Sequence, residues 1–284
     1  MTRAARRRLL VAAGAAPFLA LAGAHAQSVR RAVSVGGAVT EIVYAVGAGS
    51  TLVGADSTST FPAPAEKLPR VGYMRQLSAE GVLALKPDLL VATAEAGPPA
   101  VLTQIESTGV AVKRLAVRHS VESLRENVRE VAGLFGAVEG GRRVIAEIDA
   151  QWGKARARVA AATGRPRVLF VLAHGGGAPM AAGDGTAAES MIAYAGGVNA
   201  VQGMQGYKPL TAEAALAAAP DFILITQQGL DEAGGIDRLL ARPGLALTPA
   251  GRARRVVAMD ALVLLGFGPR MPSAVLDLAT RLHG

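Results

Sequence analysis

Cysteine is absent from this 284-residue sequence, so the chain can form no disulfide, can offer no thiolate to a metal and has no cysteine to carry a lipid. Aromatic residues are scarce, at 4%. Basic residues are scattered among acidic ones instead of forming a stripe of the kind that follows phosphates. We therefore expect no nucleic acid among the partners of this protein.

The first 26 residues differ in kind from the rest. Four arginines, three of them at 6–8, precede an apolar run over 9–22, and Ala24-His25-Ala26 follows. This order predicts a secretory signal peptide cleaved after Ala26, and hence a periplasmic protein. The apolar run is too short to span a bilayer comfortably. A retained anchor helix is the alternative, and both the Sec and the twin-arginine export routes stay open.

The remainder is long and apolar enough for two α/β domains. Removing residues 1–26 takes away four of the 30 basic residues and none of the 22 acidic ones, which lowers the formal net charge from +8 to +4. Much of the apparent basicity therefore belongs to targeting.

Strand-like apolar segments alternate with helical ones along the mature chain. The strand-like segments are 32–35, 52–55, 89–92, 110–115, 168–172, 221–226 and 256–259. The alternation predicts an α/β fold of two Rossmann-like lobes with mainly parallel sheets. One long helix, with its helical pattern over 141–162, joins them, and a ligand cleft lies between them.

The expected division of the chain is an N-terminal lobe at 28–136, a connecting helix at 137–163 and a C-terminal lobe at 164–284. Helical patterns within the lobes include 40–46, 101–107, 121–134 and 186–195. The segment 56–70 has three prolines and many hydroxyl groups, and we expect it to be an unstructured loop that lines the site.

Segments 77–91 and 210–224 form an internal repeat, with seven identities in fifteen positions. Each has a capping hydroxyl, a glutamate in the first helical turn, a Pro-Asp stop and an apolar strand, and each follows a Gly-Tyr pair. Two interpretations of Glu80 and Glu213 stay open at this point. They stabilise the helix dipoles, by a few tenths to about 1 kcal/mol each, or they present paired negative charges to one partner.

Tyr73 stands out because Arg75 lies two residues away. A tyrosine in this position is commonly an amphipathic surface residue. A nearby cation, however, favours the phenolate over the phenol, and a phenolate is a hard oxygen donor suited to ferric iron, as in tyrosine-ligated haem. The sequence has no carboxylate or histidine cluster for a bare metal ion, so iron would arrive inside a ligand.

His174 opens a run of three glycines that is similar to the oxyanion-hole motif of esterases. The chain has no Gly-x-Ser-x-Gly elbow, so a hydrolase would lack its nucleophile. The glycine-rich segment 47–52 also fails the dinucleotide fingerprint, because it follows a helix and ends in leucine. We expect a protein that is not an enzyme.

Five segments together resemble one family, the periplasmic haem-binding proteins of bacterial ABC haem importers, whose two lobes are joined by a rigid helix. The segments are 72–80 (GYMRQLSAE), 86–88 (KPD), 168–176 (VLFVLAHGG), 180–183 (MAAG) and 206–213 (GYKPLTAE). The resemblance extends over essentially the whole mature chain.

The resemblance implies roles for five candidate residues. Tyr73 matches the axial tyrosine, Arg75 the arginine that supports it, and His174 a position that in some members supplies a second iron ligand from the opposite lobe. Tyr207 is expected to line the haem pocket, but the resemblance carries no role over to it. Glu80 and Glu213 match glutamates that dock each lobe on arginines of the membrane permease.

The implied cargo is ferric haem b (hemin), carried by a monomer and delivered to a permease dimer in the inner membrane, downstream of an outer-membrane haem receptor. One alternative is a carrier of the same architecture for a corrinoid or a ferric siderophore, in which Tyr73 packs against the ligand. A second is a periplasmic hydrolase that uses the His174 loop.

Overall fold

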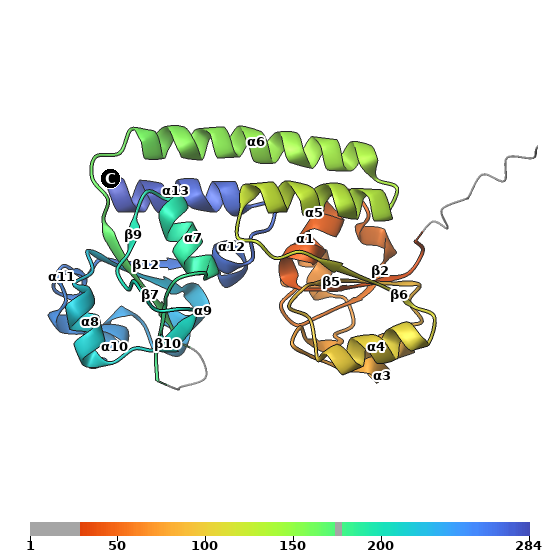
Figure 1. Cartoon of the computed structure of the whole chain (residues 1–284), viewed down its shortest axis with the longest axis horizontal. Helices are drawn as coiled ribbons and strands as arrows, with labels where there is room; N and C mark the ends of the chain where they lie inside the picture. The colour runs from red at the N-terminus through yellow and green to blue at the C-terminus, as the bar shows by residue number, and fades with distance from the viewer. Residues whose placement is uncertain (1–28, 174–177) are drawn as a thin grey trace, which may run out of the picture.

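The computed structural model describes residues 29–173 and 178–284. They form two α/β units, and the long helix α6 (Val138–Ala160) runs along both (Figure 1). At about 1.5 Å per residue, this 23-residue helix is about 34 Å long. The predicted signal peptide and His174 lie outside the described residues.

The first unit is built on a four-stranded sheet with the order β2-β1-β5-β6. All of its neighbouring strands are parallel, which confirms the prediction from the strand and helix alternation. The strands are β1 (Ala32–Val35), β2 (Leu52–Ala55), β5 (Leu89–Thr93) and β6 (Ala111–Leu115). The α-helices are α1 (Gly37–Ala45), α2 (Ala63–Glu66), α3 (Ala79–Ala84), α4 (Pro99–Ser107) and α5 (Val121–Leu134).

The second unit carries a six-stranded sheet with the order β10-β8-β7-β11-β12, and β9 pairs with β7. The strands are β7 (Arg167–Leu172), β8 (Met180–Ala182), β9 (Val198–Asn199), β10 (Tyr207–Pro209), β11 (Phe222–Thr226) and β12 (Val256–Met259). Strands β7, β9, β11 and β12 run parallel, whereas β8 runs antiparallel to both of its neighbours, β7 and β10. Strands β8 and β10 have only three residues each, too few to show a strand pattern in the sequence.

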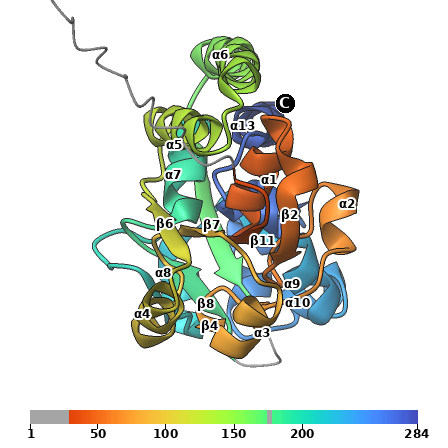
Figure 2. The ribbon, with the colours of Figure 1, turned by 90° about the vertical axis from the view of Figure 1, so that its right-hand side faces the viewer.

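Seven α-helices of the described residues follow β7 in the chain. They are α7 (Ala187–Tyr194), α8 (Ala212–Ala218), α9 (Gln227–Glu232), α10 (Ile236–Leu240), α11 (Pro249–Arg252), α12 (Ala261–Leu265) and α13 (Met271–His283). In both ribbon views α5 and α13 lie beside α6, and both pack against it (Figure 2). This layer of helices connects the two units.

The central strands are buried on both faces. Leu90 of β5 and Phe170 of β7 have no exposed surface, as is usual for parallel sheets covered by helices. Trp152 of α6 meets Tyr194 of α7 edge to face, with their ring centroids 5.1 Å apart. Within residues 29–173 and 178–284, no helix is both long enough and apolar enough to cross a membrane.

Two predicted details are wrong. Helix α1 begins at Gly37 instead of 40, and the predicted unstructured loop 56–70 contains helix α2. Helix α6 begins at Val138, three residues before the helical pattern at 141 and inside the expected connecting helix at 137–163. Glycine weakens a helix, which hides the starts of α1 and α6 in the sequence. At Gly140 the reason for the glycine is packing, because a Cβ there would lie 2.0 Å from the carbonyl oxygen of Val46.

The sequence repeat corresponds to a repeat of structure. The hydroxyls of Ser78 and Thr211 cap α3 and α8, each accepting a hydrogen bond of 3.1 Å from the amide three residues later. At the other end of each helix, Lys86 and Ala219 adopt positive φ values of 48° and 40° directly before a proline. Each lobe therefore starts and stops this helix in the same way.

Each repeat also has an arginine partner that its sequence pattern does not reveal. Arg31 donates to carbonyl oxygens at the end of α3, at 2.6 and 3.1 Å, and Arg167 donates to the end of α8 at 2.8 Å. Asp88 and Asp221 accept hydrogen bonds from the backbone amides of the same two arginines. The Pro-Asp step thus ties each helix end to the strand that opens its sheet.

Candidate functional site

Tyr73 lies on a two-strand hairpin formed by β3 (Gly72–Tyr73) and β4 (Gln76–Leu77). Gly72 makes the hairpin possible, because its φ is 105° and a Cβ there would lie 2.8 Å from the Gln76 carbonyl oxygen. Tyr73 is 39% exposed. The local fold therefore presents the phenol instead of burying it.

Two neighbouring loops fix this hairpin through the backbone. The Ser57 amide donates to the carbonyl of Gly72 at 2.9 Å. On the other side, the Gly97 amide donates to Met74 and the Gly97 carbonyl accepts from Leu77, both at 2.9 Å. The position of Tyr73 is thus set by the segments that follow β2 and β5.

The segment after β2 is itself held by a buried carboxylate. Asp56 is fully buried and accepts hydrogen bonds from the amide of Gly36 at 2.8 Å, from Thr58 at 2.7 and 3.0 Å, and from the hydroxyl of Ser59 at 2.8 Å. A buried charge is tolerated when it is hydrogen-bonded in this way. Asp56 therefore stabilises the start of the loop that leads to the Tyr73 hairpin.

Arg75 contacts Tyr73 directly, as the sequence interpretation requires. Its Nη1 donates to the Tyr73 hydroxyl at 3.1 Å, and its Nη2 donates to Glu95 Oε2 at 2.5 Å. Burial lowers the pKa of the Arg75 guanidinium, but Glu95 and then Tyr73 outweigh burial and raise it overall. Arg75 is therefore a fixed positive charge beside the phenol.

Sequence reasoning missed Glu95. It lies 20 residues from Arg75, on the loop that follows β5, and belongs to no motif. The only indication in the sequence is its place after the carboxyl end of a parallel strand, where ligand sites of open α/β sheets usually form.

Tyr207 faces this group from the other lobe. It lies on β10, packed edge to face against Phe170 with ring centroids 6.3 Å apart. The pKa of its phenol is raised, chiefly by burial and then by Glu95, against opposing effects of Arg75 and the Ala188 amide. Tyr207 is thus within electrostatic reach of Arg75 and Glu95, and its environment keeps it protonated more firmly than a free phenol.

His119 is a further residue that the sequence did not single out. It lies between β6 and α5, and its ring centroid is 5.1 Å from that of Phe267, which precedes α13. Burial lowers the pKa of His119, while Glu95 and Glu189 oppose this effect. The imidazole therefore lies in the same region between the lobes. His174 lies outside the described residues, so its placement relative to Tyr73 stays a prediction.

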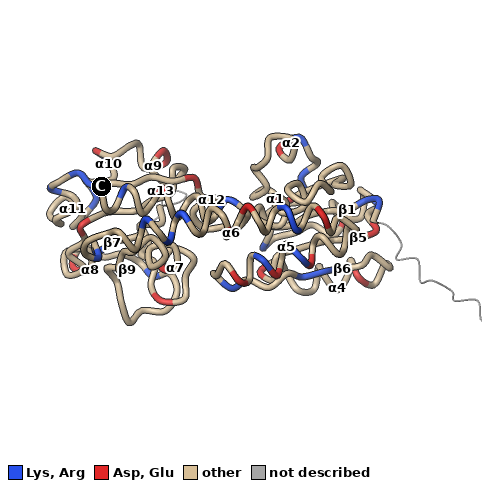
Figure 3. Tube along the Cα trace, turned by 90° about the horizontal axis from the view of Figure 1, so that it is seen from above, with Lys and Arg blue, Asp and Glu red and all other residues tan. Residues whose placement is uncertain are grey.

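Glu80 and Glu213 occupy matching places in the two lobes. Both are exposed and lie in the first turns of α3 and α8, which are on the side of the molecule away from α6 (Figure 1). The pKa of the Glu213 carboxyl is lowered, first by a hydrogen bond from its own backbone amide and then by one from the Thr211 side chain. Elsewhere on the chain, positive and negative residues are interspersed over both units (Figure 3).

The described residues also line two cavities beside α6, and neither involves Tyr73. One of about 570 Å³ lies between α6 and α7, where Trp152 and Tyr194 line it. Another of about 400 Å³ lies where α1, α6 and Arg270 meet. No group of three or more metal-ligating side chains occurs in the part of the chain that the structure describes.

The sequence model of the family described as "Periplasmic binding protein" matches residues 33–262. The chain belongs to the periplasmic binding protein family. The structure titled "Periplasmic heme-binding protein BhuT in complex with two hemes" is 50% identical to this periplasmic binding protein, with a TM-score of 0.85, and the match covers 89% of this chain and 97% of the other. The apo form of the periplasmic heme-binding protein RhuT from Roseiflexus sp. RS-1 is 42% identical, with a TM-score of 0.87, and the match covers 90% and 98%.

Among curated proteins, this periplasmic binding protein is 34% identical over 100 residues to a vitamin B12-binding protein of Yersinia pestis. That match covers 35% of this chain and 36% of the relative, so it spans about a third of either protein. The proteins to which this chain is similar are thus named for two ligands, heme and vitamin B12.

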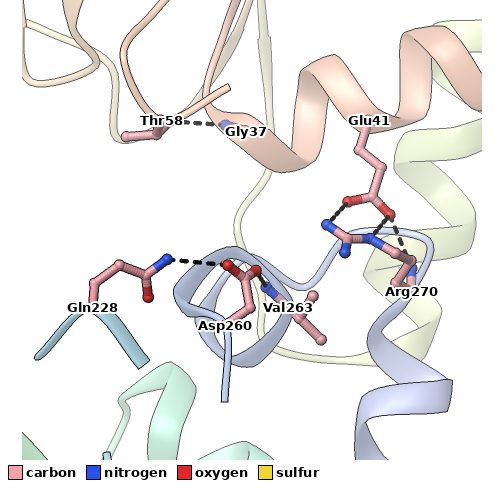
Figure 4. A network of polar contacts seen from close by, with 7 residues as sticks. All are labelled: Gly37, Glu41, Thr58, Gln228, Asp260, Val263 and Arg270. Atoms are coloured by element: carbon pink, nitrogen blue, oxygen red, sulfur yellow. Dashed lines mark hydrogen bonds and ion pairs between the residues drawn. The ribbon is translucent and has the colours of Figure 1, made fainter. Parts of the chain in front are cut away.

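An ion pair fixes the two lobes of this binding protein to each other. Glu41 of α1 accepts three hydrogen bonds from Arg270, which precedes α13: from its backbone amide and Nε at 3.1 Å each, and from Nη2 at 3.0 Å (Figure 4). The guanidinium also lies over the ring of Phe61, 3.7 Å from its centroid. Close by, a Cβ on Gly37 would come within 2.6 Å of Leu262 of α12. Tyr73 and Tyr207 therefore belong to lobes held in a defined arrangement.

Proposed function

We propose that this periplasmic binding protein captures haem in the periplasm and delivers it to the permease of an ABC importer. The observation that carries the proposal is the 50% identity, over nearly the full length of both chains, to a structure that holds two hemes. The second support is local, since the chain presents an exposed tyrosine hydrogen-bonded to an arginine, and that arginine lies within electrostatic reach of Tyr207 of the other lobe.

Tyr73 is the proposed iron ligand. A phenolate oxygen is a hard anion that suits ferric iron, and the Arg75 guanidinium donates to the Tyr73 hydroxyl oxygen at 3.1 Å. The pKa of the Tyr207 phenol is raised, chiefly by burial, and this favours its neutral form. We accordingly assign Tyr207 to the wall of the haem site. We assign His174, which belongs to the same lobe as Tyr207, to the position of a second iron ligand.

Glu80 and Glu213 are the proposed docking residues. Their matching positions, exposure and helix N-termini give the two lobes equivalent negative points on the side away from α6. A dimeric permease presents the same basic surface twice, so one glutamate per lobe would meet one permease subunit each. The lobes are correspondingly assigned to 28–136 and 164–284, with the connecting helix between them.

A competition titration tests the ligand class. Purified protein is titrated with hemin, cyanocobalamin and a ferric siderophore, and binding is followed by absorbance or tryptophan fluorescence. We expect hemin to bind tightest and Tyr73→Ala to weaken hemin more than His174→Ala does. Tighter binding of cyanocobalamin would favour the second candidate, a corrinoid carrier, which the match to the vitamin B12-binding protein supports over 100 residues.

Docking is tested separately with the variant Glu80→Ala, Glu213→Ala. We expect unchanged hemin affinity and impaired haem uptake in proteoliposomes that contain the permease. The matched control is Glu139→Ala, which removes an exposed carboxylate on α6 and should leave uptake intact. A collapse of hemin affinity in the double variant would mean that these glutamates serve the ligand site instead.

A further inference from the structure

The guanidinium of Arg75 is divided between two partners. Nη1 donates to the phenol of Tyr73 at 3.1 Å, and Nη2 donates to the carboxylate of Glu95 at 2.5 Å. Both Arg75 and Glu95 are about half exposed, with side-chain exposures of 53% and 42%. An exposed ion pair of this kind contributes little to folding, so stability does not account for its presence beside the candidate ligand.

Glu95 is well placed to hold Arg75. The loop that carries it is tied to the Tyr73 hairpin by two backbone hydrogen bonds of 2.9 Å, from Gly97 to Met74 and from Leu77 to Gly97. The carboxylate and the phenol therefore keep a constant spacing, and the guanidinium bridges them. A free arginine on a two-residue turn would have no such constraint, because its side chain has many rotamers.

We propose that Glu95 is a positioning residue that holds Arg75 against the Tyr73 oxygen and keeps the guanidinium from binding the carboxylates of the incoming ligand. This inference rests on the proposed function, in which Tyr73 binds the iron of haem. Haem carries two propionates, and an arginine prefers to bind a carboxylate with two parallel hydrogen bonds. With Nη2 already committed to Glu95, Arg75 remains the partner of the phenolate.

In this proposal Glu95 acts by accepting a hydrogen bond from Arg75, and not only by placing a negative charge near it. Two substitutions of Glu95 separate these two effects. Glu95→Gln keeps an oxygen that can accept from Nη2 but removes the negative charge. Glu95→Ala removes both. If Glu95 acts by holding Arg75, the glutamine variant should bind hemin nearly as well as the natural protein, whereas the alanine variant should resemble Arg75→Ala.

The test is a set of hemin titrations with the full mature chain. We expect Glu95→Ala to weaken hemin binding about 10-fold to 100-fold, which is the usual effect of losing a residue that orients a metal ligand. Arg75→Ala should give a similar loss, and the double variant should be no weaker than Arg75→Ala alone. Glu139→Ala, which also removes an exposed carboxylate paired with an arginine, should have no effect.

Resonance Raman of the iron–phenolate mode supplies a readout that a change in folding would not move. Glu95→Ala and Arg75→Ala should shift this mode together, Glu95→Gln should leave it in place, and all variants should keep their thermal unfolding midpoint. Equal losses in the alanine and glutamine variants, or losses that add up in the double variant, would overturn the positioning role.

Two failures can be told apart in the same experiment. If Tyr73→Ala abolishes the iron–phenolate mode while Glu95→Ala behaves like the natural protein, the inference about Glu95 is wrong and the proposed function stands. If Tyr73→Ala has the affinity and spectrum of the natural protein, Tyr73 is not the ligand and both fail.

Discussion

Replacing Arg270 with methionine should destabilise the protein by about 3.5–4 kcal/mol, chiefly because it leaves the buried carboxylate of Glu41 without its charged partner. The Glu41 side chain is only 5% exposed. It loses the two charge-assisted hydrogen bonds from the guanidinium and keeps only the one from the backbone amide of residue 270, and no other basic side chain is paired with it in the described residues.

The size of the loss follows from the environment of the pair. Removing one partner of a buried ion pair costs about 3–5 kcal/mol. Arg270 is itself 33% exposed and borders a cavity of about 400 Å³, so water can reach the vacated site and the lower end applies. Loss of the contact between the guanidinium and Phe61 adds about 0.5–1 kcal/mol. At about 2–4 °C per kcal/mol for a chain of this size, the total loss of about 3.5–4 kcal/mol should lower the unfolding midpoint by about 7–16 °C.

Urea and thermal unfolding, followed by circular dichroism, measure this loss. The double variant Glu41→Leu, Arg270→Met removes both charges and should lie within about 1 kcal/mol of the natural protein. Arg281→Met is the matched control, because it breaks an exposed pair with Asp277 and should cost less than about 1 kcal/mol.

The pH dependence gives a second check on Glu41. Burial raises the pKa of this carboxyl above 4.5, in spite of the opposing effect of Arg270. An acid whose pKa is raised in the folded state contributes most to stability at low pH, and this contribution is lost as pH rises through the folded pKa. Without Arg270 the folded pKa rises further, so the deficit of Arg270→Met should be smaller at about pH 5 than at about pH 8. A deficit below about 1 kcal/mol at pH 8, or a double variant as unstable as Arg270→Met, would refute this account.

Two further variants test the placement of the site. Gly72→Ala should destabilise the protein by about 1–3 kcal/mol and weaken hemin binding, because φ is 105° there and a Cβ would lie 2.8 Å from a carbonyl oxygen. Gly203→Ala is the control, because Gly203 also has a positive φ, of 73°, but a Cβ there would meet open space. This variant has the strain of a positive φ without the steric clash, and it should keep its affinity for hemin. His119→Gln tests the interlobe histidine. Burial lowers the pKa of His119 in the folded protein below its ordinary value of 6.5, so its contribution to stability is lost as pH falls below 6.5 and through the folded pKa. The variant should therefore lose less stability than the natural protein between about pH 7 and pH 5.5. An identical pH dependence of the two unfolding free energies would contradict the burial of His119.

Local patterns in the sequence were sufficient for much of the fold. The parallel central strands, α5 at Val121–Leu134 and the repeated cap and Pro-Asp stop follow from periodicity and from residues with strong backbone preferences. The short strands β8 and β10 could not be predicted, since a strand of three residues has no measurable alternation. Arg31, just before β1, and Arg167, the first residue of β7, donate to the ends of α3 and α8, and neither has a local signature in the sequence.

The site was predictable only where its residues are close in sequence. Tyr73 and Arg75 are two residues apart, and their contact could be expected from the sequence. Glu95 is 20 residues from Arg75, and Glu41 is 229 residues from Arg270, so these pairs arise only when the chain folds.

The most direct test of the central claim is the visible and resonance Raman spectrum of the hemin-loaded protein with each tyrosine replaced in turn. Tyr207→Phe is the matched control, because it removes the hydroxyl of the second Gly-Tyr pair. The account predicts that Tyr73→Phe loses the iron–phenolate mode and its charge-transfer absorption, whereas Tyr207→Phe keeps both. An unchanged spectrum in Tyr73→Phe would contradict the assignment of Tyr73 as the iron ligand.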